Sequence, residues 1–312
     1  MPRTCNGQKK LNFRLIFHVN QDTTNPEAHA KALNVFAQSS HMVILDEAFR
    51  LRIKFLGMYY ARVDQGWDSR GRLESDCAHH IMFVMSGYGR VRHQQHSMEL
   101  VPGFAYWCPA NHPVARECPE QMELYYIRFR CEWFEGIDAL LNWPSRQHLS
   151  LGPWDMPALT REWSEPKLSL NAILRLQGFI RLWMAEHFPN LADFLAHHQS
   201  AYVRFGEILQ KLEDTCNASI QIEDLAKLHG SSLSAFSRAF TRSLGLSPKA
   251  YLNLKINESA CHLLMNSHEP LKIISEKLHF ADEFYFNRFF TKMNGIPPAG
   301  YRRRMQNLEE QK

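Results

Sequence analysis

The sequence lacks the features that define several large classes of protein. None of its apolar runs approaches the roughly 20 residues that a helix needs to cross a bilayer. The first 20 residues contain no apolar core followed by a small-residue cleavage site, so we expect no secretory signal. The seven cysteines are scattered and include no C-x-x-C pair, which favours reduced thiols in the cytoplasm over disulfides or a zinc knuckle. A net charge of +4 is too small to indicate a nucleic-acid partner by itself.

What is present is the composition of a folded protein. The 312 residues are 45% hydrophobic and 22% charged, enough for about two domains. Residues 1–44 are weakly patterned and are expected to form an N-terminal extension. From Phe49 to Phe55 apolar residues alternate with basic ones, as in a half-buried strand. Further short strand-like runs, separated by Gly or Pro turns, occupy 80–85, 89–93, 104–108 and 125–129. This spacing predicts an antiparallel β-sandwich or β-barrel within residues 45–150.

A helical period replaces the strand period near residue 168. Apolar residues spaced by three and four from Leu170 to Met184 predict an amphipathic helix that ends before Pro189. Residues 151–198 are therefore expected to connect the β-domain to a second, helical domain. The apolar stripe of this helix has two interpretations: it packs on the β-domain, or it pairs with its copy in a second subunit.

The last hundred residues contain an internal repeat at an offset of 50 residues. Nine identities fall in register over 24 positions, which is hard to obtain by chance. The pairs are Leu228/Leu278, His229/His279, Phe236/Phe286, Arg238/Arg288, Phe240/Phe290, Thr241/Thr291, Gly245/Gly295, Pro248/Pro298 and Tyr251/Tyr301. Each copy has the pattern of a helix, a short turn, a second helix and a glycine stop.

Local chemistry in both copies supports this pattern. Ser232 and Asp282 are placed to cap the second helix of their copy. The phenylalanines spaced by four residues predict one buried stripe per helix, and Gly245 and Gly295 suit a left-handed C-terminal cap. Two helices joined by a tight turn form a helix-turn-helix, whose second helix fits the major groove of DNA. Residues 248–266 would form a strut of about 28 Å, close to one DNA turn of roughly 34 Å.

At these residues the chain resembles the DNA-binding domain of AraC/XylS-type transcription regulators, over residues 199–305. The positions that match the second motif of the family are Ile274, Phe280, Asp282, Tyr285, Phe286, Arg288, Phe290, Gly295, Pro298, Tyr301 and Arg302. The departures from the family pattern are Ser275 for Ala, His279 for Gly and Thr291 for Lys. His279 would be strained if its position requires a positive φ.

The resemblance implies that the exposed faces of the two recognition helices contact bases. In the first copy these positions are Ser234, Ser237, Arg238 and Thr241, and in the second Glu283, Phe284, Asn287 and Arg288. Arg pairs with guanine, Asn with adenine and Glu with cytosine, while an aromatic ring can contact a thymine methyl. The expected phosphate contacts are Lys249, Lys292, Arg302, Arg303 and Arg304. The alternative for the arginines is a solvated or packing role.

Residues 103–112 resemble the second motif of the cupin family, whose barrels commonly precede such a DNA-binding domain. The adjacent His79 and His80 would point to opposite faces of a strand, and Val114 stands where metal-binding cupins place a histidine, so no metal and no cofactor is expected. Flat apolar groups with hydrogen-bonding atoms suit a small polar effector such as a carbohydrate. The candidates for the effector site are Trp67, Arg70, His80, Tyr106, Trp107 and His112. For each aromatic residue the alternative is ordinary core packing.

These observations predict an α+β protein, in which a cupin-like antiparallel β-barrel precedes an all-α domain with two helix-turn-helix motifs and a tail at 306–312. The expected function is that of a cytoplasmic, ligand-responsive transcription regulator and not of an enzyme. Its expected partners are double-stranded DNA, a small-molecule effector, RNA polymerase and a second copy of the chain, without a membrane. Two alternatives are a cupin enzyme with an appended nucleic-acid module and a regulator without an effector.

Overall fold

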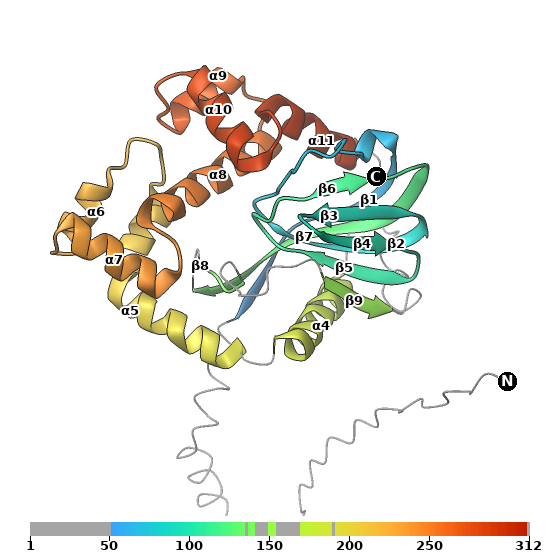
Figure 1. Ribbon diagram of the computed structural model, residues 1–312, viewed down its shortest axis with the longest axis horizontal. Helices are drawn as coiled ribbons and strands as arrows, with labels where there is room; N and C mark the ends of the chain where they lie inside the picture. The colour runs from blue at the N-terminus through green and yellow to red at the C-terminus, as the bar shows by residue number, and fades with distance from the viewer. Residues whose placement is uncertain (1–50, 135–136, 141–148, 154–168, 189–190, 311–312) are drawn as a thin grey trace, which may run out of the picture. The chain divides into compact units, whose positions relative to one another are not determined.

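The structure is a computed structural model that describes residues 51–134, 137–140, 149–153, 169–188 and 191–310. The predicted N-terminal extension, most of the connection before residue 169 and the last two residues lie outside these ranges. Strands precede helices along the chain, so the predicted α+β class is confirmed (Figure 1). The strands are β1 (Arg52–Asp64), β2 (His79–Gly87), β3 (Gly89–His93), β4 (His96–Leu100), β5 (Phe104–Cys108), β6 (Ala115–Glu117), β7 (Gln121–Phe134), β8 (Ile137–Asp138) and β9 (Leu149–Pro153), and a 3-10 turn η1 (Gln65–Trp67) follows β1.

The strands form two antiparallel sheets, which we call together the β-domain. The larger sheet has the order β1-β7-β2-β5-β9 with β8 beside β7, and the smaller has the order β4-β3-β6. The predicted runs at 89–93 and 104–108 coincide with β3 and β5. Strand β1 extends further than its alternation predicts, because the register shifts between Phe55 and Gly57 and the strand resumes on the other side of this bulge.

Two apolar cores lie on opposite faces of the larger sheet. Between the two sheets, residues such as Met82, Val91 and Leu124 form an inner core. On the other face, Phe83 and Phe129 of the sheet pack against helix α4 (Leu170–His187). Ser169 caps α4 by accepting a hydrogen bond from the Ala172 amide at 3.1 Å. The apolar stripe of this helix is therefore mostly occupied by the β-domain of its own chain.

Seven further helices make up the all-α part of the described chain. They are α5 (Leu191–Asp214), α6 (Ile222–Leu228), α7 (Leu233–Leu244), α8 (Pro248–Asn266), α9 (Leu271–Lys277), α10 (Glu283–Asn294) and α11 (Pro298–Glu310). The internal repeat corresponds to the pairs α6–α7 and α9–α10, joined by the 19-residue helix α8. In each copy the paired phenylalanines are fully buried, as predicted. No helix in the described ranges is long and apolar enough to cross a membrane.

The predicted caps are present in both copies. Ser232 accepts a hydrogen bond from the Ala235 amide at 3.3 Å, and Asp282 from the Tyr285 amide at 2.6 Å. Gly245 and Gly295 end α7 and α10 in the left-handed region, with φ of 70° and 76°. His279, which stands where the family has glycine, adopts a φ of 56°. The copy that contains α10 therefore holds a non-glycine residue in a conformation that L residues rarely adopt.

Candidate DNA interface and effector cavity

Helix α7 presents a small polar face on the side opposite its buried phenylalanines. Ser234, Arg238 and Thr241 are exposed, and Ser237 is half-buried. The Thr241 hydroxyl donates to the Ser237 carbonyl at 2.7 Å, which fixes its rotamer. This face offers one guanidinium fork and several hydroxyl groups to a partner, and it contains no exposed carboxylate.

Helix α10 presents a larger and chemically different face. Phe284 is 79% exposed, which is unusual for a phenylalanine. Glu283 and Arg288 are also exposed, and Asn287 is half-buried. The Arg288 guanidinium lies 5.8 Å from the centroid of the Tyr285 ring, a contact that restrains the long side chain. All eight predicted base-contacting residues thus lie at the outer or rim positions of α7 and α10.

The predicted phosphate contacts differ in their surroundings, and one of them, Arg304, is paired with Glu74 at 2.7 Å. Lys292 is exposed in the last turn of α10. Arg302 on α11 is half-buried and donates to the carbonyl of Leu264 at 3.3 Å and to that of Glu269 at 2.7 Å. The guanidinium of Arg302 therefore joins the end of α8 to the start of α9, and the exposed neighbour Arg303 is freer to reach a phosphate.

A buried amide pair, which gave no signal in the sequence, fixes α10 on α8. The Asn294 amide nitrogen donates to Asn257 at 2.6 Å, and the Asn257 amide donates back at 3.1 Å. Both residues are fully buried. Because each amide satisfies the other, the pair sets one orientation of the second helix-turn-helix on the α8 strut.

A small cavity of about 30 Å³ lies within the β-domain and brings three of the six predicted effector residues together: Trp67, His80 and His112. This volume holds one or two water molecules. His80 points away from His79, which packs in the other core and pairs with Asp138 at 2.8 Å, so the predicted opposite orientation of the two histidines is confirmed. Among the described residues no cluster of three or more His, Cys, Asp or Glu could hold a metal ion.

The other three predicted effector residues do not line this cavity. The Tyr106 ring belongs to the inner core, and its hydroxyl accepts a hydrogen bond from the Val101 amide at 2.9 Å. Trp107 is fully buried on the opposite face of the sheet, 5.1 Å from Trp183 of α4. Arg70 is exposed in a turn with a φ of 53°. The six predicted effector residues thus lie in different places: three line the cavity, Tyr106 and Trp107 lie in two different cores, and Arg70 lies on the surface.

A second cavity of about 560 Å³ lies where β1 and β7 approach α5 and α8. This volume is within the usual range for small-molecule sites. Four of its charged residues are paired with one another: Lys255 contacts both Glu213 and Glu258, and Arg130 lies 3.1 Å from Glu258. The sequence gave no sign of this cavity, because its walls come from segments as far apart as Lys54 and Asn266.

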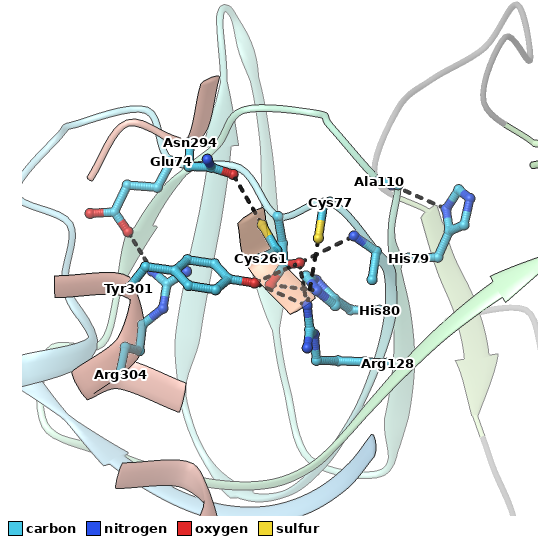
Figure 2. Close-up of polar contacts among 12 residues, drawn as sticks. Glu74, Cys77, His79, His80, Ala110, Arg128, Cys261, Asn294, Tyr301 and Arg304 are labelled. Carbon is cyan, nitrogen blue, oxygen red and sulfur yellow. Dashed lines mark hydrogen bonds and ion pairs between the residues drawn. The ribbon is translucent and has the colours of Figure 1, made fainter. Parts of the chain in front are cut away.

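A buried polar network joins the β-domain to α11 (Figure 2). Asp76 accepts from Arg128 of β7 at 2.6 Å, and the Arg128 guanidinium also donates to the Tyr301 hydroxyl of α11 at 3.0 Å. Burial alone would raise the pKa of Asp76, but Arg128 and His80 outweigh it and hold that pKa well below its ordinary value. The Tyr301 hydroxyl thus links the ionised Asp76–Arg128 pair of the β-domain to the helical domain.

Two helix-turn-helix units on one strut define a protein that binds double-stranded DNA. Residues 225–304 match the helix-turn-helix domain family, and this part of the chain is similar to the DNA-binding domain of AraC-type transcription regulators. It is 24% identical over 236 residues to the Msm operon regulatory protein of Streptococcus mutans, an alignment that covers 73% of this chain and 84% of that protein. It is 25% identical over 131 residues to the activator RclR of Escherichia coli, covering 41% of this chain and 44% of RclR.

The fold extends the likeness beyond the DNA-binding domain. The structure of ToxT from Vibrio cholerae superimposes with a TM-score of 0.57 at 12% identity, and covers 80% of this chain and 98% of ToxT. Its fold therefore matches both the antiparallel β-domain and the helical domain. The relatives are transcription regulators, so they give no support to the alternative of an enzyme with an appended DNA-binding module.

Proposed function

We propose that this regulator contacts two successive major grooves on one face of DNA through α7 and α10. The observation that carries the proposal is the equivalence of the two helices: each has the same cap, the same buried phenylalanine pair and an exposed opposite face. The strut between them is about 28 Å long, at about 1.5 Å per residue, which is comparable with one DNA turn of roughly 34 Å.

The contacts expected from this geometry differ between the two helices. Helix α7 would contact bases through Ser234, Ser237, Arg238 and Thr241, and α10 through Glu283, Phe284, Asn287 and Arg288. Phosphate contacts would come from Lys292 and Arg303, while Arg302 supports the helices from within. Selection of binding duplexes with the full chain, followed by footprinting, should give two protected major-groove segments about 10 base pairs apart. A single protected segment would contradict the two-helix arrangement.

We further propose that the β-domain senses a small polar effector in the cavity lined by Trp67, His80 and His112. At its present volume of about 30 Å³ the cavity does not admit a carbohydrate, so a sugar would require it to enlarge. A thermal-shift screen of the full chain would identify stabilising compounds. Trp67→Phe should change the shift in Tm that such a compound produces. Trp107→Phe, in the opposite core, should lower the Tm of the free protein without changing the ligand-dependent shift. An effector-free regulator would show no ligand-dependent shift.

The exposed side of α4 supports a homodimer. Leu170, Leu174 and Leu182 are 70%, 54% and 61% exposed and lie four or eight residues apart, and Gly178 between them leaves open space. Such an exposed apolar stripe suits a second copy of the same helix. Analytical sedimentation should show a dimer for the wild type and a monomer for Leu174→Glu. Arg175→Glu, at the neighbouring exposed position, is the control.

We place the protein in the cytoplasm as an activator that contacts RNA polymerase.

A further inference from the structure

The cavity that contains Trp67, His80 and His112 is bordered by an unusual group of charges. Glu74 accepts hydrogen bonds from two arginines, Arg116 of β6 and Arg304 of α11, the latter at 2.7 Å. The other carboxylate, Asp76, is shared by Arg128 at 2.6 Å and His80 at 3.3 Å. The walls therefore bring together two guanidinium groups and two carboxylates, and the buried Arg128 guanidinium lies behind Asp76.

These charges do not balance. Burial, the largest influence, lowers the pKa of His80, so its imidazole is neutral near pH 7. Burial raises the pKa of the Cys108 thiol to about 12, so this thiol is neutral as well. Burial also raises the pKa of the Tyr126 hydroxyl above its ordinary value. When Arg128, which pairs with Asp76 from outside the walls, is included, three positive and two negative side chains leave one excess positive charge in this group. An uncompensated buried charge is costly, and an anion would compensate it.

Arg116 is the side chain best placed to receive such an anion. Its Nε is buried and has no hydrogen-bond partner, although the other end of its guanidinium contacts Glu74. The guanidinium lies 5.4 Å from the centroid of the Trp67 ring, which holds its plane beside the cavity. Burial, and to a smaller extent the charge of Arg304, lower the pKa of Arg116 to about 10, while Glu74 acts in the opposite direction.

We propose, building on the function proposed above, that this cavity binds a small anion, a carboxylate or another anion of similar size, through Arg116. Guanidinium groups bind carboxylates through short, charge-assisted hydrogen bonds, and Arg116 has a free N–H for one of them. A volume of about 30 Å³ admits an ion of the size of formate or chloride, while a neutral sugar has neither the size nor the charge that the site requires.

Occupancy of this site would act on the second recognition helix. The bound anion competes with Glu74 for the same guanidinium, and Glu74 is the group that holds Arg304 of α11. The next residue, Ser75, donates from its amide to the Asn294 carbonyl at 3.0 Å and from its hydroxyl to the Met293 carbonyl at 2.8 Å. A displaced Glu74 therefore weakens contacts at the end of α10, and we expect the DNA affinity of the full chain to change when the anion binds.

The test is thermal unfolding of the full chain with sodium formate, acetate, chloride or phosphate, at an ionic strength balanced by sodium HEPES, whose anion is too large for the cavity. Acetamide is the neutral counterpart of acetate. At least one small anion should raise Tm saturably, as mass action requires, while acetamide should not. The arms with chloride and phosphate distinguish an inorganic ion from a carboxylate. Equal shifts with all salts would be a general salt effect and would overturn the proposal.

Three variants make the test specific. Arg116→Gln should abolish the saturable shift, while Arg90→Gln, an arginine of β3 that pairs with Glu99 outside the cavity, should retain it. Glu74→Gln removes the competing carboxylate and should tighten anion binding by about tenfold or more, since charges a few ångströms apart interact strongly even at an effective dielectric constant of about 20. A gain of affinity cannot arise from misfolding. Unchanged or weaker binding in Glu74→Gln would refute the site.

A DNA-binding titration of the same samples separates this proposal from the function on which it rests. If the chain binds DNA but shows no response to anions, the anion site is refuted and the proposed function stands. An anion response in a chain that binds no DNA would support the site and contradict the proposed function.

Discussion

Replacement of Arg128 by Met tests whether the β-domain and the helical domain are joined by a buried ion network. Arg128 is 1% exposed and donates to Asp76 at 2.6 Å and to the Tyr301 hydroxyl at 3.0 Å. Methionine keeps much of the side-chain length and removes the charge. The Asp76 carboxylate would then stay buried with the Ala78 amide at 3.1 Å and with His80 and the Tyr301 hydroxyl at 3.3 Å each as its nearest polar neighbours.

The magnitude follows from the asymmetry of buried ion pairs. Removal of one partner of such a pair costs about 3–5 kcal/mol, because the other charge remains buried without its counter-ion. Removal of both partners often costs little when apolar groups fill the space. The double variant Asp76→Leu with Arg128→Met should therefore be clearly more stable than Arg128→Met alone. Urea unfolding of the three variants and the wild type gives the coupling free energy as a double-mutant cycle.

The pH dependence of the unfolding free energy provides a second, independent test of the Asp76–Arg128 pair. In the wild type the pKa of Asp76 lies well below its ordinary value, so its stabilising contribution is present above about pH 4 and is lost as the pH falls through that depressed pKa. Without Arg128, burial would raise the pKa of Asp76, and the penalty would grow as the pH rises above about 4. The gap in unfolding free energy between wild type and Arg128→Met should thus be smaller at pH 5 than at pH 7.5.

The reasoning is refuted if the double variant loses as much as the sum of the two single variants. That result would mean that Asp76 and Arg128 stabilise the fold independently. A gap in unfolding free energy that does not vary between pH 5 and 7.5 would likewise show that Asp76 is not ionised through Arg128.

Further predictions concern the two helix-turn-helix units. As base contacts, Arg238→Ala and Arg288→Ala should each lose about 1–3 kcal/mol of binding free energy, and only against duplexes that retain the half-site of that helix; equal losses on scrambled DNA would make them phosphate contacts. Lys292→Ala should weaken binding to all sequences alike and lower the salt slope by about one, measured by titration at several salt concentrations. Gly295→Ala should lower Tm more than Gly230→Ala, because both glycines have a positive φ but a Cβ at Gly295 would collide with the Leu73 carbonyl, while one at Gly230 meets open space; equal losses would contradict this contact.

The helical half of the fold was predictable because its signals are local. A serine or aspartate cap, two phenylalanines one turn apart and a glycine stop specify a helix within about 15 residues, and the sequence states this pattern twice. Strands β3 and β5 were predictable for the same reason. Strand β4 was not, because only Met98 and Leu100 are apolar in it and it pairs on one side with β3.

The predicted effector site was less accurate, and part of the reason lies in the strand period. Tyr106 and Trp107 are neighbours in β5, so their side chains point to opposite faces, and they could not both line one cavity. The same rule separated His79 from His80 correctly. The charged residues of the cavity could not be found in this way. Glu74 and Arg304 are 230 positions apart, and no local pattern indicates that they meet.

The two helix-turn-helix units differ in what holds them, although their sequences repeat. Gly245 and Gly295 end equivalent helices in the same conformation, yet the end of α10 is held by hydrogen bonds from Ser75 of the β-domain. Further contacts from the β-domain, through Arg128 and Glu74, reach α11, the helix that follows α10. A change inside the β-domain therefore has a direct path to the second unit. For the DNA-binding protein this predicts that an effector alters affinity for the α10 half-site more than for the α7 half-site, because the Ser75 and Glu74 contacts reach α10 and α11 directly and do not reach α7.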